Sequence, residues 1–464
     1  MKLKWKLFLG LILIILGIPF LFWFFQYLSK ATPVKANILI DTKKINGTFP
    51  DRWKALAQGG EETGVRMLQN VVPQVAGLYP RYIRIDHIYD FYNVVSRSGD
   101  GSISLNWQKL DSTVCDIFHT GAKPFLVLGY MPEALSGDNS LISVPKKWDD
   151  WSYVVQKTIE RYSGKYNQFC GNVKGALLQD IYYEVWNEPD LETFGKWSIY
   201  GGKDYRQLYY YSAIGAGRAQ NVNNFFLGGP ATTRPYQSWM QGFLRYVRDN
   251  KLRLDFISWH HYSKNIDDYA DDIRNVNSWL ATSEFTVFQN IPKIITEWGY
   301  DSEPNPIADT NVGAAHTIAA IRNFIDENYQ MAFLFEIKDG PTPRWGILTQ
   351  TGKPKPRYDA LKLLNLLTGT ELKVQGEGTF VRALASQNGN VVTSVLVNYD
   401  PQNNNNELVP VSFNNLDNGI YTLTLNYLSG QTVTFDNIEI TNSQLQRNVL
   451  MVPNMVVAIQ LQKK

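Results

Sequence analysis

Between about residues 50 and 367, short apolar runs alternate with longer amphipathic stretches. The short runs predict buried strands and the stretches predict covering helices, a combination typical of a parallel sheet. The expected strands lie at residues 53–58, 82–85, 124–129, 181–186, 225–229, 254–259, 293–298 and 332–337. The expected helices include residues 147–162, 205–219, 239–250, 311–327 and 357–367. Eight strands favour a closed (β/α)₈ TIM barrel over an open doubly wound sheet, and no Gly-x-Gly-x-x-Gly turn suggests a dinucleotide site.

After Gly369 the pattern changes to β-rich segments separated by Asn/Gly turns. Alternating apolar residues there predict a small C-terminal antiparallel β-sandwich over residues 371–464. The barrel is expected over residues 50–370. Residues 31–49 are expected to form a linker, in which the extended stretch 36–45 could add a strand to the sandwich.

The amino-terminal segment predicts a position outside the cytoplasm. Lysines precede an uncharged apolar run at residues 7–25, which as a helix is long enough to cross a bilayer. Residues 1–30 are therefore expected to form a short cytoplasmic tail and one transmembrane helix. A cleavable signal ending near residues 29–31 is the alternative, which would make the protein secreted.

Charge and cysteine content narrow the possible partners. Of the formal charge of +2, four positive charges lie in the first thirty residues, so the remainder is close to neutral and no nucleic-acid partner is expected. Cys115 and Cys170 are the two cysteines of the chain, too few for a four-ligand zinc site. They could form one disulfide bond or remain two buried thiols. The 13 Trp, 26 Tyr and 23 Phe suit both a core and sugar-binding surfaces.

Polar side chains cluster at the carboxyl ends of the expected strands, where a parallel barrel places its active site. They are Arg84, Asp86, Tyr130, Glu133, Asn187, Glu188, His260, His261, Tyr262, Glu297 and Trp298.

Two of these residues, Glu188 and Glu297, are glutamates on different strands. Paired carboxylates across a barrel mouth suit hydrolysis of a glycosidic bond, because one donates a proton and the other attacks or activates water. This chemistry requires no metal and no cofactor. The alternative for each glutamate is a salt-bridged or solvated surface acid.

Several stretches make the chain similar to a known family. "YYEVWNEPD" resembles the Asn-Glu-Pro motif of the clan A barrel glycosidases, and "KIITEWGY" resembles their nucleophile strand. Four further stretches resemble glycoside hydrolase family 39 and occur in its order: "KPFLVLGYMPEAL", "FLGGPA", "DFISWHHY" and "GKPKPRYDALKLL". The resemblance covers roughly residues 50–367.

The resemblance implies a double-displacement mechanism that retains the anomeric configuration. Glu188 would be the general acid/base and Glu297 the nucleophile. Asn187 would hydrogen-bond the 2-hydroxyl of the sugar being cleaved.

Neighbouring residues would support these groups. The resemblance implies that Arg84 holds Glu297 ionised, the alternative being an ordinary barrel salt bridge. His260 and Tyr262 match the family's His-x-Tyr, with Tyr262 donating to Glu297. His261 is then expected to be structural.

Other candidate substrate-binding residues are less fixed by the family pattern. Trp298 and Trp345 could form subsite walls or pack in the core. Where the family commonly has Arg-Phe-His-Gly, this chain has Arg84, Ile85, Asp86 and His87, so Asp86 is expected to replace the pocket histidine, or the histidine to be displaced. Because of these departures, the sequence indicates the mechanism more strongly than it indicates the substrate.

The function expected from these features is a membrane-anchored retaining glycosidase that acts on an extracellular or cell-surface polysaccharide. This layout resembles anchored endoglycosidases of exopolysaccharides. One alternative is an exo-acting β-xylosidase-like enzyme. The other is a carbohydrate-binding surface protein without catalysis.

Overall fold

The computed structural model describes residues 33–59, 62, 65–171, 173–174 and 177–464. The predicted anchor or signal at residues 1–30 lies outside these described residues. Among the residues that are described, no helix combines the length and apolarity needed to cross a bilayer.

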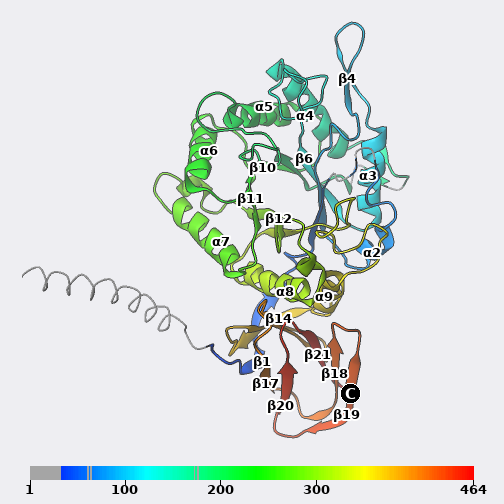
Figure 1. The fold of residues 1–464 in the computed structure, drawn as a ribbon, viewed down its shortest axis with the longest axis vertical. Coiled ribbons are helices and arrows are strands. Elements are labelled where there is room, and N and C mark those ends of the chain that lie inside the picture. The colour runs from blue at the N-terminus through cyan, green and yellow to red at the C-terminus, as the bar shows by residue number, and fades with distance from the viewer. Residues whose placement is uncertain (1–32, 60–61, 63–64, 172, 175–176) are drawn as a thin grey trace, which may run out of the picture.

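Eight parallel strands close into a barrel, which confirms the fold predicted from the alternation of the sequence (Figure 1). In order they are β2 (Ala55–Gln58), β3 (Tyr82–Ile85), β6 (Lys123–Leu128), β9 (Ile181–Val185), β10 (Phe225–Thr232), β11 (Phe256–Tyr262), β12 (Lys293–Gly299) and β13 (Met331–Phe335). The last strand pairs in parallel with the first, which completes the ring. The predicted strand limits differ from these by about three residues at most.

Helices surround the barrel and bury their apolar faces against it (Figure 1). The α-helices are α2 (Val72–Ala76), α3 (Gln108–His119), α4 (Trp148–Tyr162), α5 (Tyr205–Arg218), α6 (Gln237–Asp249), α7 (Asp267–Leu280), α8 (Asn311–Asp326) and α9 (Pro356–Leu364). The short 3₁₀ helices are η2 (Thr286–Phe288) and η3 (Pro306–Asp309). Two small hairpins lie in the connections, β4 (Val95–Arg97) with β5 (Ile103–Leu105) and β7 (Gln168–Phe169) with β8 (Val173–Lys174).

The interior of the barrel has an apolar half and a polar half. A separate core cluster inside the ring includes Tyr82, Phe125, Tyr182, Phe256 and Phe333. Further along the same strands, towards their carboxyl ends, the buried residues become charged and polar. The apolar half therefore closes one end of the barrel, and the other end is left for chemistry.

The C-terminal domain is one curled, hydrogen-bonded sheet of nine strands around its own core. Its strands are β1 (Ile38–Thr48), β14 (Thr370–Gln375), β15 (Val381–Asn388), β16 (Val391–Asn398), β17 (Glu407–Asn414), β18 (Gly419–Tyr427), β19 (Thr432–Ile440), β20 (Gln444–Met451) and β21 (Val456–Lys463). The described pairs in this sheet are antiparallel apart from β1 with β17. The predicted antiparallel β-sandwich is thus confirmed as a mostly antiparallel domain, but its strands form one continuous sheet and one of its pairs is parallel.

Strand β1 explains the exception. It precedes the barrel in the sequence, yet it lies between β14 and β17. It pairs in parallel with β17 over residues 38–41, and a register shift after Ile40 lets it continue along β14. The described part of the chain therefore passes through this sheet at β1, forms the whole barrel and returns to the sheet at β14.

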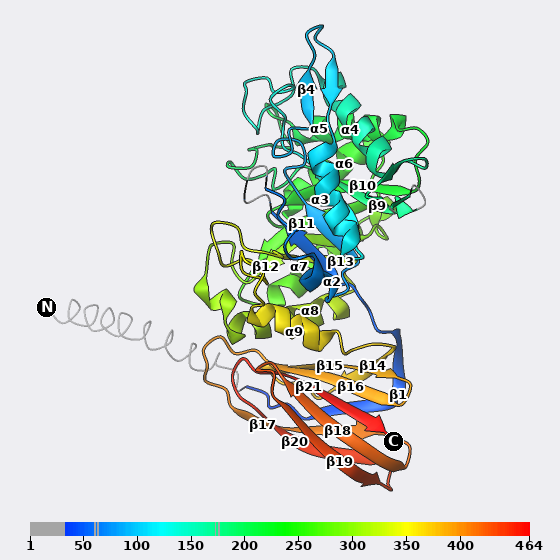
Figure 2. The ribbon, with the colours of Figure 1, turned by 90° about the vertical axis from the view of Figure 1, so that its right-hand side faces the viewer.

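The sheet packs beneath α8 and α9, where it contacts the chain that follows β11 (Figure 2). Tyr399 of the sheet lies against the His316 ring at 5.5 Å and donates to the carbonyl of Lys264 at 2.6 Å. Burial lowers the pKa of His316 to about 4, so the neutral ring donates from Nε2 to the carbonyl of Ser263 at 2.7 Å. The C-terminal domain thus supports the backbone directly after Tyr262.

Cys115 on α3 and Cys170 form a disulfide bond, with their Cα atoms 5.4 Å apart. The sequence leaves open either a disulfide bond or two buried thiols, and the structure contains the disulfide bond. It closes a loop of 55 residues that includes α4 and β6. Such a bond stabilises a protein mainly by restricting its unfolded chain.

We expect the double variant Cys115→Ser/Cys170→Ser to lower the free energy of unfolding by up to about 4 kcal/mol, the loop-closure term for this separation. Urea denaturation with and without a thiol reductant measures the change. The reductant should destabilise the wild type by a similar amount and leave the double variant unaffected. Equal stability of the wild type and the double variant would contradict this account.

Candidate active site

A tight turn at the end of β9 brings the Asn187-Glu188 pair over the barrel mouth. Trp186 and Glu188 have φ values of +72° and +41°, a left-handed backbone that such residues rarely adopt. Two hydrogen bonds hold the turn: Trp186 Nε1 donates to the carbonyl of Phe194 at 2.6 Å, and the Glu188 amide donates to that of Ala231 at 3.0 Å. The apolar strand therefore ends on polar residues because the chain turns there across the opening.

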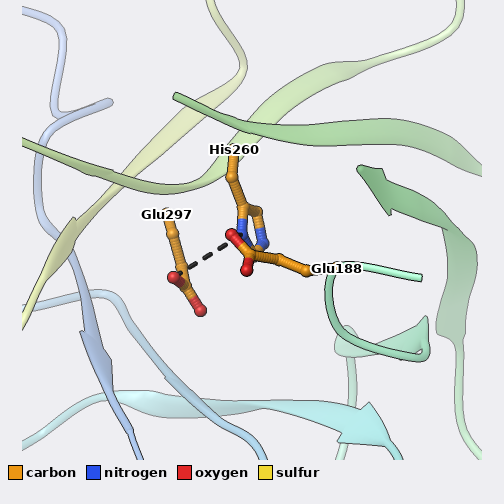
Figure 3. A group of neighbouring side chains, drawn as sticks. All are labelled: Glu188, His260 and Glu297. Carbon is orange, nitrogen blue, oxygen red and sulfur yellow. Dashed lines mark hydrogen bonds and ion pairs between the residues drawn. The ribbon is translucent and has the colours of Figure 1, made fainter. Parts of the chain in front are cut away.

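Glu188, His260 and Glu297 meet at the centre of this opening (Figure 3). One oxygen of each carboxylate and one nitrogen of the imidazole all lie within 4.8 Å of one another. His260 Nδ1 lies 3.0 Å from Glu188 Oε1 and 3.5 Å from Glu297 Oε2. All three residues are buried, at no more than 8% exposure.

Arg84 on β3 is the buried cation of the site. Its guanidinium donates to Glu297 Oε1 at 2.6 Å, to Glu184 Oε2 at 2.8 Å and to Asn187 Oδ1 at 2.7 Å. Burial alone lowers the pKa of Arg84, but Glu184 and Glu297 outweigh this effect and raise it above its ordinary value. Arg84 therefore stays charged and fixes the orientation of Glu297.

Asn187 and Tyr262 complete the ring of contacts around the two glutamates. The amide of Asn187 donates to the hydroxyl of Tyr130 at 3.0 Å, while its oxygen accepts from Arg84. The hydroxyl of Tyr262 donates to Glu297 Oε2 at 2.8 Å. Both oxygens of Glu297 thus have a donor.

The protonation of the site follows from burial and from these neighbours. Burial raises the pKa of Glu297, while His260 and Arg84 oppose the rise. Burial alone would lower the pKa of His260, but Glu297 and the hydrogen bond to Glu188 leave it raised. Burial and the nearby Glu297 raise the pKa of Tyr262 well above its usual range, so its hydroxyl remains a donor.

A cavity of about 780 Å³ opens above these groups. Five of the residues predicted as catalytic or substrate-binding in the barrel mouth line it together with Trp345: Asp86, Asn187, Glu188, Tyr262 and Glu297. Arg84 and His260 lie beneath it and act through the glutamates they contact. Its other lining residues are Gly59, His87, Leu191, Thr193, Phe194, Thr233, Arg234, Tyr236, His261, Ser302, Glu303 and Phe335.

Two residues predicted at the mouth lie elsewhere. Trp298 is fully buried against Phe324 and Tyr269, with ring centroids 4.8 Å and 6.0 Å away, so its substrate-binding assignment is wrong and its core-packing alternative is correct. Successive residues of a strand point to opposite faces, so Trp298 points to the helices because Glu297 points inward. Glu133 is exposed and does not line the cavity.

The sequence predicts Asp86 as a substrate-binding residue at the end of β3. It lines the cavity at 9% exposure. His87 also lines the cavity, but its ring stacks on Phe91 at 3.9 Å and its Nδ1 contacts Asp90 at 2.7 Å. Asp86 and His87 thus both border the cavity, and whether Asp86 replaces the histidine or His87 is a displaced one stays a prediction.

Sequence reasoning missed Glu184 and Arg234. Glu184 is a fully buried carboxylate in the middle of an apolar strand, and that unusual position was the available signal. Arg234 lies two residues beyond the end of β10, in a connection that no motif covers. His261, expected to be structural, lines the cavity beside it.

The carboxylates and the imidazole could in principle coordinate a metal ion, since Glu188, His260 and Glu297 offer three suitable atoms. Arg84 already places a positive charge 2.6 Å from Glu297. A metal cation beside it would meet electrostatic repulsion. The donor set therefore fits proton transfer and nucleophilic attack better than metal binding.

The distance between the two carboxylates indicates whether the reaction retains or inverts the anomeric configuration. Oxygens within 4.8 Å of each other agree with the roughly 5 to 5.5 Å typical of enzymes that retain the anomeric configuration. Inverting enzymes need roughly 6.5 to 9.5 Å, to leave room for a water molecule.

Comparison with known proteins gives a family for this arrangement. The sequence pattern of glycosyl hydrolases family 39 matches residues 37–415. The chain is 26% identical over 351 residues to a β-xylosidase from Caldicellulosiruptor saccharolyticus, covering 69% of each chain. It is 25% identical over 337 residues to a β-xylosidase from Geobacillus stearothermophilus, covering 64% of each, slightly under two thirds of that relative.

A solved structure shares the fold over nearly the whole chain. It is described as a GH39 enzyme from Xanthomonas axonopodis pv. citri, with a TM-score of 0.75 and 19% identity. The match covers 94% of this chain and 99% of that one.

We expect Arg84→Met to shift the low-pH limb of the pH–rate profile to higher pH. Loss of the guanidinium removes a charge that lowers the pKa of Glu297, so this carboxyl ionises only at higher pH. Measurement of kcat/KM against pH checks this, with Arg84→Lys as the control that keeps the charge. An unchanged low-pH limb in Arg84→Met would contradict the assignment.

Proposed function

The chain belongs to glycosyl hydrolases family 39 and is a glycosidase that hydrolyses O-glycosyl compounds, and from this premise we propose a retaining mechanism with Glu297 as nucleophile and Glu188 as general acid/base. The observation that carries the proposal is the pair of carboxylates within 4.8 Å across one barrel mouth.

In the first step, Glu297 attacks the anomeric carbon while Glu188 donates its proton to the leaving oxygen. Arg84 and Tyr262 each donate to one oxygen of Glu297, which favours its ionised form and fixes its direction. The attack forms a glycosyl–Glu297 ester and releases the leaving-group alcohol.

In the second step, Glu188 takes a proton from a water molecule, which attacks the anomeric carbon and releases Glu297. Two inversions at this carbon leave its configuration unchanged. Arg84 Nη2 lies 3.4 Å from His260 Nε2 and can only donate, so His260 carries its proton on Nδ1. From there it donates to Glu188 and orients it for both proton transfers. Asn187, whose amide oxygen accepts from Arg84, is proposed to bond the 2-hydroxyl of the sugar attached to Glu297.

We propose an extracellular or cell-surface polysaccharide as the substrate, cleaved internally. A cavity of about 780 Å³ exceeds the space of one sugar ring, and Phe194 and Tyr236 line it as well as the two glutamates. Trp345 is proposed as an aromatic wall for one of these sugars. Exo-action on a β-xyloside is the second candidate, because the two curated relatives are described as β-xylosidases.

A location outside the cytoplasm, with the amino-terminal segment as membrane anchor, is part of the proposal. The Cys115–Cys170 bond supports an oxidising compartment, and the apolar run at residues 7–25 supports an anchor. Recovery of the full-length chain in the soluble cytosolic fraction of the cells that make it would refute this location.

We expect the wild-type enzyme to release oligosaccharides of several lengths from at least one polysaccharide in a panel that also contains aryl β-xylosides. Glu297→Gln should lower the rate by about 10⁴-fold or more, because the amide cannot attack. Product size by chromatography distinguishes internal cleavage from release of single sugars, and NMR of the first product reports its anomeric configuration. An inverted product would refute the retaining mechanism.

We expect Glu188→Ala to retain far more activity on aryl glycosides with acidic leaving groups than on natural glycosides. Only a poor leaving group needs the proton that Glu188 supplies. Rates on a pair such as a dinitrophenyl glycoside and an unactivated oligosaccharide measure the difference. Azide should restore turnover of the aryl substrate, because it attacks the glycosyl–Glu297 ester without a base. Equal losses on both substrates would remove Glu188 from this role.

A further inference from the structure

The cavity has a second polar centre, formed by Arg234, that the proposed mechanism does not use. Arg234 follows β10, and its side chain is 52% exposed. Among the described residues that line the cavity, it is the one lysine or arginine. Its guanidinium is therefore within reach of a ligand that enters the cavity.

The contacts of Arg234 leave its charge largely unneutralised. Its Nη2 donates to Nε2 of His261 at 2.5 Å, and the closest carboxylate oxygen recorded for it belongs to Asp268 at 3.9 Å. The carboxylate of Asp268 is itself engaged by Ser263 and Asn265, at 2.6 Å each. Arg234 is thus held by a ring nitrogen and not by a close ion pair.

His261 is fixed so that it can hold the arginine. Arginine can only donate, so Nε2 of His261 accepts and its proton must lie on Nδ1. Nδ1 donates to Oδ2 of Asp272 on α7 at 2.5 Å. His261 is 2% exposed, which leaves its ring little freedom. The chain Asp272–His261–Arg234 therefore fixes a cation at the edge of the cavity.

The position of Arg234 relative to Glu188 sets which sugar it would contact. Arg234 belongs to the connection after β10, which is tied to the connection after β9: Thr233 donates to Asp190 from its amide at 3.0 Å and from its hydroxyl at 2.5 Å. This is the side of the cavity from which Glu188 projects. A general acid must face the leaving group, so these connections border the leaving-group side.

We propose that Arg234 is a specificity-determining residue that binds the carboxylate of an acidic sugar on the leaving-group side of the bond that is cleaved. This inference rests on the proposed function, because the leaving-group side of the cavity is defined by the proposed role of Glu188 as general acid. Guanidinium groups bind carboxylates with paired, charge-assisted hydrogen bonds. The substrate class is then a polysaccharide that contains uronic acids, with His261 and Asp272 as positioning residues.

The test measures the binding of oligosaccharides to the full-length Glu297→Gln variant, in which turnover is blocked. The probes are the trimers of galacturonic and mannuronic acid and a hyaluronan tetrasaccharide, each paired with its carboxyl-reduced form. In each pair every carboxylate becomes a hydroxymethyl group and the rest of the oligosaccharide stays the same. Isothermal titration calorimetry gives both dissociation constants.

We expect at least one acidic probe to bind about tenfold or more tightly than its reduced form. Arg234→Gln, which keeps a donor but loses the charge, should abolish this preference. Arg234→Lys should keep part of it, and His261→Ala should weaken it, because the arginine loses the ring that positions it. Arg218→Gln is the matched control, because Arg218 is 55% exposed at the end of α5 and does not line the cavity.

No preference for any acidic probe, or a preference that survives Arg234→Gln, would overturn the proposal. If Arg234→Gln does not fold, as thermal unfolding would reveal, the comparison of Arg234→Lys and His261→Ala decides. Failure of this inference and failure of the proposed function are separable, because binding requires no turnover. A chain that is inactive on every glycoside yet prefers the acidic probe through Arg234 would refute the mechanism alone.

Discussion

The buried guanidinium of Arg84 is the interaction on which the active site depends. One cation contacts two carboxylates, Glu184 and Glu297, and the amide of Asn187, and each of these residues is at most 6% exposed. Removal of any partner would leave a charge without compensation in a low-dielectric interior, at a cost of roughly 3 to 5 kcal/mol. Glu184 therefore has a function although it does not line the cavity. It forms one ion pair with Arg84 and Glu297 forms the other, so the positive charge of Arg84 is shared between the two carboxylates.

The fold could be predicted because barrel strands are apolar on both faces, and the eight short runs stand out for that reason. The position of the two glutamates followed from the same pattern, since strand ends converge at one mouth. The face of Trp298 could also have been derived, because it alternates with Glu297 along β12. The parallel pairing of β1 with β17 could not, since it depends on a partner strand hundreds of residues away in the sequence.

The contacts of Arg234 could not be predicted from the sequence either, because they too depend on how separate elements of the chain pack together. His261 is adjacent to His260 in the sequence, but the two rings serve different groups: one contacts Glu188 and the other joins Asp272 to Arg234. The two rings contact different groups because successive residues of a strand point to opposite faces, and because α7 lies beside the face to which His261 points. The result is a cavity with carboxylates at its centre and a cation at its edge, so an elongated ligand with one negative group has a preferred direction in it.

The path of the chain through the C-terminal sheet has a consequence for how this protein can be divided. Because β1 enters that sheet before the barrel begins, and Tyr399 and His316 support the backbone beside Tyr262, no single cut separates the two domains without breaking the sheet. The sheet is thus unlike a detachable binding module at the end of a flexible tether. The two parts should melt together in one calorimetric transition, and exchange of the sheet between relatives would alter the barrel along with it.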